Sequence, residues 1–217
     1  MIISKNIDVA DNLEGSVYGQ FRMGWAYSNG EGVAKDQKLA VSWYKKAADN
    51  GNTAAMNNLA VCYANGEGVA KDTKKSFELY QEASEKGNLL STLNLARAYE
   101  LGEGTNIDKK KAFELYKKVA SKDSTLYSDE DKEYVARGIY NVGKMYFWGN
   151  GVEKNYEEAV KYFNLAKNQG NMDALCGLGI AYYFGQGVPV DREQGKKLVR
   201  EASERGHARA KSLLKLM

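Results

Sequence analysis

The residues of this 217-residue sequence best suited to chemistry are a recurring glycine-rich loop, a single histidine and a short acidic run. The loop reads GEGVAKD at residues 30–36, and glycines spaced in this way can surround a phosphate. It lacks the Gly-Lys-Ser/Thr ending and the preceding strand of a phosphate-binding loop. We therefore interpret it as a turn that connects two helices.

His207 has the side chain of a general base for nucleophilic catalysis. The sequence offers it no obvious cysteine or serine partner, so we expect an exposed or helix-capping histidine. The acidic run SDEDKE at 128–133 lacks the spaced ligands and central glycine of a calcium loop, and Ser128 before carboxylates is typical of a helix start. We predict no catalytic residue, no metal site and no cofactor, and therefore a protein that is not an enzyme.

The overall composition excludes several functional classes. Thirty-one Lys and Arg against 28 Asp and Glu leave a net charge of +3, which argues against a dedicated nucleic-acid-binding protein. The start MIISKNIDVADNLEG has no apolar signal region, so we do not expect a cleaved secretion signal. The sequence contains no run of about 18 apolar residues, so we do not expect a membrane span. Cys62 and Cys176 are too few for a disulfide framework. We expect buried or half-buried thiols in a cytoplasmic protein.

The elements that must position these residues repeat along the chain. Gly-x-Gly recurs at offsets of 36, 36, 47 and 36 residues, and 47 is 36 plus 11. The octapeptide NGEGVAKD stands unchanged at 29–36 and 65–72. A fixed period between 20 and 50 residues is typical of a solenoid. The glycine pairs are Gly30/Gly32, Gly66/Gly68, Gly102/Gly104, Gly149/Gly151 and Gly185/Gly187.

Each repeat has the pattern of two helices. In the second repeat, Ala55, Leu59 and Tyr63 share one face of a first helix, and we expect Tyr63 to be a large buried side chain. Gly66 then stops the helix, since glycine accepts the left-handed conformation of a C-terminal cap. Asp72 is placed to cap the second helix. The same capping position holds Asp36, Asp72, Asp108, Asn155 and Asp191.

The first repeat carries a resemblance to a known family. Residues Gly24 to Ala48 read GWAYSNGEGVAKDQKLAVSWYKKAA, which resembles the Sel-one-like repeat (SLR) of the tetratricopeptide-repeat-like superfamily. The resemblance implies an all-α fold, an α/α superhelical solenoid of antiparallel helix pairs. We expect a single repeat domain over 1–217, with a terminal half-repeat at 207–217 as a C-terminal capping helix. The five 36-residue repeats are placed at about 16–51, 52–87, 88–134, 135–170 and 171–206.

Eleven additional residues near 124–134 lengthen the third repeat. Because Ser128 and the carboxylates after it form a good helix start, we predict that the next helix begins near Ser128 and is about two turns longer than its counterparts. A tolerated loop expansion is the favoured interpretation, since longer surface loops cost little entropy. The alternative is that Leu126 and Tyr127 make a second contact with a partner.

The resemblance also indicates where a partner would bind. In tetratricopeptide arrays the first helices line a concave groove, and the groove positions of this chain vary between repeats. Aromatic and arginine side chains are enriched in interface hot spots, while the competing interpretation is that neighbouring helices cover these aromatics. The candidate partner-binding residues are Phe21, Trp25, Arg97, Tyr140, Lys144, Phe147 and Tyr183.

The leading functional hypothesis is a scaffold or adaptor that binds a protein or peptide in this concave groove. One alternative is an immunity or inhibitor protein for a cognate toxin. Another is a glycan or small-molecule recognition module, because aromatic side chains can stack on sugar rings. Arg97 and Lys144 favour a partner with acidic groups over a neutral sugar. The oligomeric state is left open.

Overall fold

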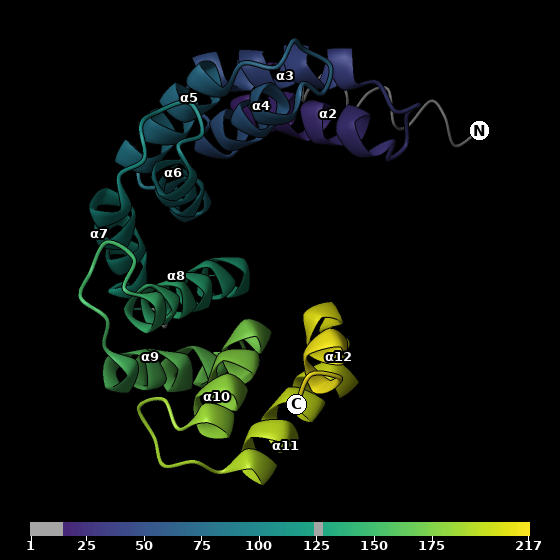
Figure 1. Cartoon of the computed structure of the whole chain (residues 1–217). Helices are drawn as coiled ribbons and strands as arrows, with labels where there is room; N and C mark the ends of the chain where they lie inside the picture. The colour runs from purple at the N-terminus through teal and green to yellow at the C-terminus, as the bar shows by residue number, and fades with distance from the viewer. Residues whose placement is uncertain (1–14, 124–127) are drawn as a thin grey trace. The chain divides into compact units, whose positions relative to one another are not determined.

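The computed structural model describes residues 15–123 and 128–217, and all regular secondary structure in these two ranges is helical (Figure 1). The chain forms two compact units, Met1–Ile107 and Asp108–Met217. The boundary falls between the two helices of the third repeat. Leu126 and Tyr127, for which a partner contact is the alternative hypothesis, lie outside the described residues.

Over its described residues, 15–107, the first unit is a series of five helices, each packed on the next. Its core alternates small and large side chains, such as Ala40, Tyr44, Ala47 and Leu59, so that neighbouring helices approach closely. The helices are α2 (Val17–Asn29), α3 (Gln37–Asp49), α4 (Thr53–Asn65), α5 (Thr73–Glu85) and α6 (Leu89–Leu101).

The second unit continues the pattern with α7 (Lys109–Ala120), α8 (Asp129–Trp148), α9 (Tyr156–Asn168), α10 (Met172–Phe184), α11 (Arg192–Glu204) and α12 (Ala208–Leu214). Helix α8 has 20 residues and α10 has 13, a difference of seven residues or about two turns. The hydroxyl of Ser128 accepts a hydrogen bond from the backbone N–H of Asp131 at 3.2 Å and so caps α8. The predicted early start and added length of this helix are confirmed.

The predicted helix ends are confirmed in both units. Gly66 has φ 80° and ends α4 in the left-handed conformation, and the carboxylate of Asp72 accepts a hydrogen bond from the backbone N–H of Lys75 at 3.0 Å. Left-handed glycines end α2, α4, α6, α8 and α10, and side-chain oxygens of the predicted Asp/Asn positions cap α3, α5, α7, α9 and α11.

The second glycine of the loop joins successive repeats. Gly68 has φ +70°, and a Cβ at this position would lie 2.1 Å from the backbone oxygen of Gln37, the first residue of α3. Gly104 has the same relation to Thr73. The sequence predicts only a turn that connects two helices here, whereas the structure adds a backbone contact with the preceding repeat. In the second unit the corresponding pairs are Gly151 with Lys109 and Gly187 with Tyr156.

The expectation that Tyr63 is buried is wrong, because this side chain is only half-buried. Tyr63 lies in the last turn of α4, where the helix leaves the core for the surface loop. Its ring is covered on one side by the start of α5, with the Lys75 ammonium 5.5 Å from the ring centre. The fully buried tyrosine of this region is instead Tyr44, which is 2% exposed.

Candidate functional site

The structure brings three of the seven predicted partner-binding residues together. Tyr140, Lys144 and Phe147 line one pocket of the second unit, and Tyr183 lies on the neighbouring helix α10 outside its lining. Phe21, Trp25 and Arg97 belong to the first unit.

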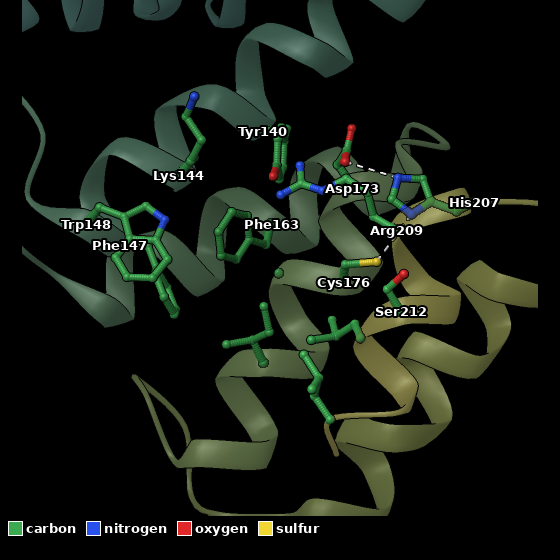
Figure 2. A pocket seen from close by; sticks show the side chains of 14 residues that line it. Tyr140, Lys144, Phe147, Trp148, Phe163, Asp173, Cys176, His207, Arg209 and Ser212 are labelled. Carbon is green, nitrogen blue, oxygen red and sulfur yellow. Dashed lines mark hydrogen bonds and ion pairs between the residues drawn. The ribbon is translucent and has the colours of Figure 1, made fainter. Parts of the chain in front are cut away.

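This pocket, here called the α8–α12 pocket, has a volume of about 390 Å³ (Figure 2). Its walls come from α8, α9, α10 and α12, so that the first helices of two successive repeats and the terminal helix all contribute. Apolar and aromatic side chains form most of the lining. They include Tyr140, Phe147, Trp148, Phe163, Ile180 and Leu213.

A glycine allows Phe163 of the second helix α9 to reach the pocket. A Cβ at Gly177 would lie 3.0–3.1 Å from atoms of the Phe163 ring, so the missing side chain leaves room for that ring. Tyr140 packs on Phe163 with ring centres 5.8 Å apart, and Phe147 packs on it at 5.9 Å. Phe147 is only 4% exposed. Phe147 therefore packs behind the other aromatic side chains of the lining and presents little surface to a partner.

Two cationic side chains line the same pocket from opposite helices. Lys144 extends from α8, with its ammonium 6.0 Å from the centre of the Tyr116 ring, and Arg209 extends from α12. The sequence predicted Lys144 and missed Arg209. The position of Arg209 in the terminal half-repeat was the available signal, since this half-repeat adds one more first helix to the surface.

The expectation that His207 lacks a nucleophilic partner is wrong. Its Nδ1 lies 3.6 Å from the Sγ of Cys176, and its Nε2 lies 3.1 Å from a carboxylate oxygen of Asp173 (Figure 2). All three side chains line the α8–α12 pocket. Cys176 is half-buried, as predicted for the cysteines, and Cys62 is buried.

The pKa of the Cys176 thiol is raised to about 11. Burial is the main cause and the negative charge of Asp173 adds to it, while the positive charge of Arg209 acts in the opposite direction. Since the pKa lies well above neutral, the thiol carries its proton at pH 7. Cys176 can therefore act as a hydrogen-bond donor to the unprotonated ring nitrogen of His207.

The predicted residues of the first unit have partners within that unit. Arg97 forms an ion pair with Glu103 at 3.1 Å, at the edge of a second pocket of about 300 Å³. Phe21 and Trp25 are half-buried against the core of α3 and α4. The positive charge of Arg97 is thus matched by a carboxylate.

Tyr183 packs against the end of the chain. Its hydroxyl donates a hydrogen bond to the backbone oxygen of Met217 at 2.6 Å, and the Arg192 guanidinium lies 5.6 Å from its ring centre. Tyr183 therefore holds the C-terminal residue close to α10.

Within residues 15–123 and 128–217, no three His, Cys, Asp or Glu side chains are arranged to hold a metal ion. At His207, the two ring nitrogens face Cys176 and Asp173 on opposite edges of the imidazole, so these three side chains do not converge on one point. Among the same residues, no helix combines the length and apolar character needed to cross a membrane.

The repeated helix pairs, their glycine turns and their caps define a helical repeat protein of the solenoid class. The sequence profile of the Sel1 repeat matches residues 17–52, 53–88, 90–124, 136–171 and 173–207. The chain belongs to the Sel1 repeat family. Sel1 repeats generally mediate protein–protein interactions, and scaffolds of this family are generally not enzymes.

Solved structures agree with the fold. A Sel1 repeat protein from Oxalobacter formigenes superimposes with a TM-score of 0.81 at 26% identity, over 92% of this chain and 75% of that one. The protein c5321, a protective antigen present in uropathogenic Escherichia coli strains, has an SLR fold and a TM-score of 0.77 at 32% identity, over 93% of this chain and 41% of that one. The predicted fold class, an all-α superhelical repeat, is confirmed.

A similar curated protein is much longer than this chain. The ERAD-associated E3 ubiquitin-protein ligase component HRD3A of Arabidopsis thaliana is 32% identical over 75 residues, which cover 35% of this chain and 11% of that protein. The match therefore spans about a tenth of the relative's length.

Proposed function

We propose that this chain is a non-enzymatic adaptor that binds a protein or peptide through the α8–α12 pocket. The pocket takes an apolar side chain of the partner, and an acidic group next to that side chain binds Lys144 and Arg209. The observation that carries this proposal is the combination of an aromatic pocket with two cations contributed by different helices.

The aromatic side chains account for the affinity. Hot spots of protein interfaces are enriched in tryptophan, tyrosine and arginine, and they lie where a pocket excludes water. Trp148 is 61% exposed at the pocket, and Tyr140 and Arg209 complete a set of these three residue types. A partner side chain that covers Trp148 removes apolar surface from water and stabilises the complex.

The charges account for the choice of partner. The lining contains the side chains of Lys144 and Arg209 and one carboxylate, Asp173, which lies against His207. An acidic group therefore finds a favourable field in the pocket, and a basic peptide or a neutral sugar does not. The small net charge of the chain favours a protein partner over nucleic acid.

The other predicted residues extend this surface in the proposal. Phe21, Trp25 and Arg97 of the first unit and Tyr183 of the second remain candidate contacts for a longer partner segment. The proposed location of the interaction is the cytoplasm. An immunity protein would bind one cognate toxin through the same residues, and a glycan-binding module would bind sugars without a requirement for acid.

The proposal is tested by selecting ligands for the whole chain from a displayed library of random peptides and measuring their affinities. Trp148→Ala is expected to weaken binding about tenfold or more, which is about 1.4 kcal/mol. Phe184→Ala is the matched control, because Phe184 is 63% exposed at the corresponding last residue of α10 and lies outside the pocket.

Selected peptides are expected to share an apolar residue beside Asp or Glu. Lys144→Glu should weaken their binding more at low salt than at high salt, since exposed charge interactions are screened. Peptides without acidic residues, or equal loss from Trp148→Ala and Phe184→Ala, would contradict the proposal. Binding to a glycan array in place of peptides would favour the alternative module.

A further inference from the structure

His207 breaks a rule that the other first helices follow. The residue before each of those helices accepts a hydrogen bond through its side chain from a backbone N–H three residues on. His207 occupies this place before α12, and its side chain makes no such bond. The residues at the other five places are Ser16, Asn52, Asn88, Ser128 and Asn171.

The imidazole of His207 instead lies between the side chains of Cys176 and Asp173 and contacts both. An ionised Asp173 can only accept hydrogen bonds, so the nitrogen next to it, Nε2, carries the proton and donates. In the neutral ring this leaves Nδ1 without a proton, and Nδ1 is the nitrogen that faces the Cys176 sulfur at 3.6 Å. The order thiol, imidazole and carboxylate is that of a nucleophile, its base and the group that orients the base.

The surroundings of Cys176 suit a reaction with an apolar reagent. The thiol is half-buried in the wall of an open pocket whose lining includes Tyr140, Phe163 and Ile180. Arg209 lies in the same lining, and its positive charge favours the negative charge that develops on sulfur during an attack.

We propose that Cys176 is a modification site that accepts the acyl group of an apolar ester or thioester, with His207 as its general base and Asp173 as the positioning residue. The sulfur attacks the acyl carbon, so that a C–S bond forms and the bond from that carbon to the leaving oxygen or sulfur breaks. The thiol proton moves to Nδ1 of His207 and then to the leaving group. The acyl carbon keeps its oxidation state, and no redox partner is required.

The step ends at the thioester on Cys176 and consumes the thiol. It is therefore a modification of the protein without turnover, and it can occur whether or not the chain is an adaptor. An acyl group on Cys176 would occupy part of the α8–α12 pocket.

The test uses the full chain and p-nitrophenyl butyrate, with release of p-nitrophenolate followed by absorbance and the modified residue located by peptide mass mapping. We expect one butyryl group per chain, on Cys176. Cys62→Ser should react as the unmodified chain does, because Cys62 is buried. Cys176→Ser should take up no butyryl group on residue 176.

His207→Asn is the decisive variant, since Asn caps three of the other first helices and is expected to preserve the fold. It should slow butyrylation of Cys176 by about 100-fold, the usual contribution of a general base. Butyrylation at lysines or at Cys62 instead, or an unchanged rate in a folded His207→Asn protein, would overturn the proposal.

Asp173→Asn keeps the proposal testable if His207→Asn does not fold. It removes the carboxylate that holds the imidazole in the required tautomer, so a rate about 10-fold lower or more is expected. A folded Asp173→Asn protein that reacts as fast as the unmodified chain would equally overturn the proposal. Circular dichroism of each variant establishes that it is folded.

Discussion

Replacement of Gly68 by alanine tests the backbone contact between successive repeats. Gly68 has φ +70° and Gly32 has φ +71°, so alanine meets the same backbone strain at both positions. A Cβ at Gly68 would lie 2.1 Å from the backbone oxygen of Gln37, whereas a Cβ at Gly32 meets no described atom within 4 Å. Gly32→Ala is therefore a matched control within the same unit.

The expected losses of stability follow from the backbone strain and from the contact with Gln37. The left-handed conformation costs alanine about 1–2 kcal/mol at either position. At Gly68 the new methyl group lies about 1 Å inside the 3.0 Å limit of real contacts, and its neighbour is backbone, which cannot rotate away. The loop must then move from the start of α3, and overpacking of this kind costs a further ~1–3 kcal/mol or more.

Thermal unfolding followed by circular dichroism at the helical band measures the difference. Since 1 kcal/mol corresponds to about 2–4 °C in a chain of this size, Gly68→Ala should melt about 2–12 °C below Gly32→Ala. Equal melting temperatures for the two variants would refute the claim that this glycine is required by the contact between repeats.

Two further perturbations test burial and the long helix. Tyr44→Ala should lower the free energy of unfolding by about 3–5 kcal/mol, and Tyr63→Ala by less than half of that, because Tyr44 is buried and Tyr63 only half-buried. Urea unfolding measures both losses, and equal losses would show that the assigned burial of the two side chains is wrong. Deletion of residues 124–134 stops just before Val135, which is 0% exposed, and should leave a folded helical protein with a single cooperative transition in each unit. Loss of that cooperativity would show that the removed turns of α8 are needed for folding.

Helix boundaries were predictable from the sequence because their causes are local. Gly66 ends α4 and Asp72 begins α5 through bonds that reach only three or four residues. The added turns of α8 could be anticipated for the same reason, since Ser128 and the carboxylates after it lie within one turn of each other.

Depth of burial was less predictable, because periodicity gives the face of a helix and not what covers it. Tyr63 lies on the expected face, yet it is half-exposed at the end of α4. Phe147 is the opposite case. It was expected on a binding surface and is buried because Tyr156 and Phe163 of α9 pack against its ring.

The cluster at His207 could not be seen from neighbouring residues. Cys176 and Asp173 precede His207 by 31 and 34 positions, which is close to one repeat, so the solenoid stacks them on the next turn of the chain. The sequence signal for this cluster is the separation of about one repeat between His207 and the two residues Cys176 and Asp173. Arg209 is hidden from the sequence for a related reason, since a terminal half-repeat predicts a capping helix and not a wall of a pocket.

The contact made by Gly68, Gly104, Gly151 and Gly187 has a consequence for how such a chain can evolve. The residues these glycines touch are Gln37, Thr73, Lys109 and Tyr156, whose side chains differ in size and charge. They can differ because the contact uses only their main-chain oxygen. A duplicated or recombined repeat therefore joins its neighbour without compensating mutations there, and the side chains on the binding surface are free to diverge. The unchanged octapeptide at 29–36 and 65–72 is the kind of sequence that such a duplication leaves behind.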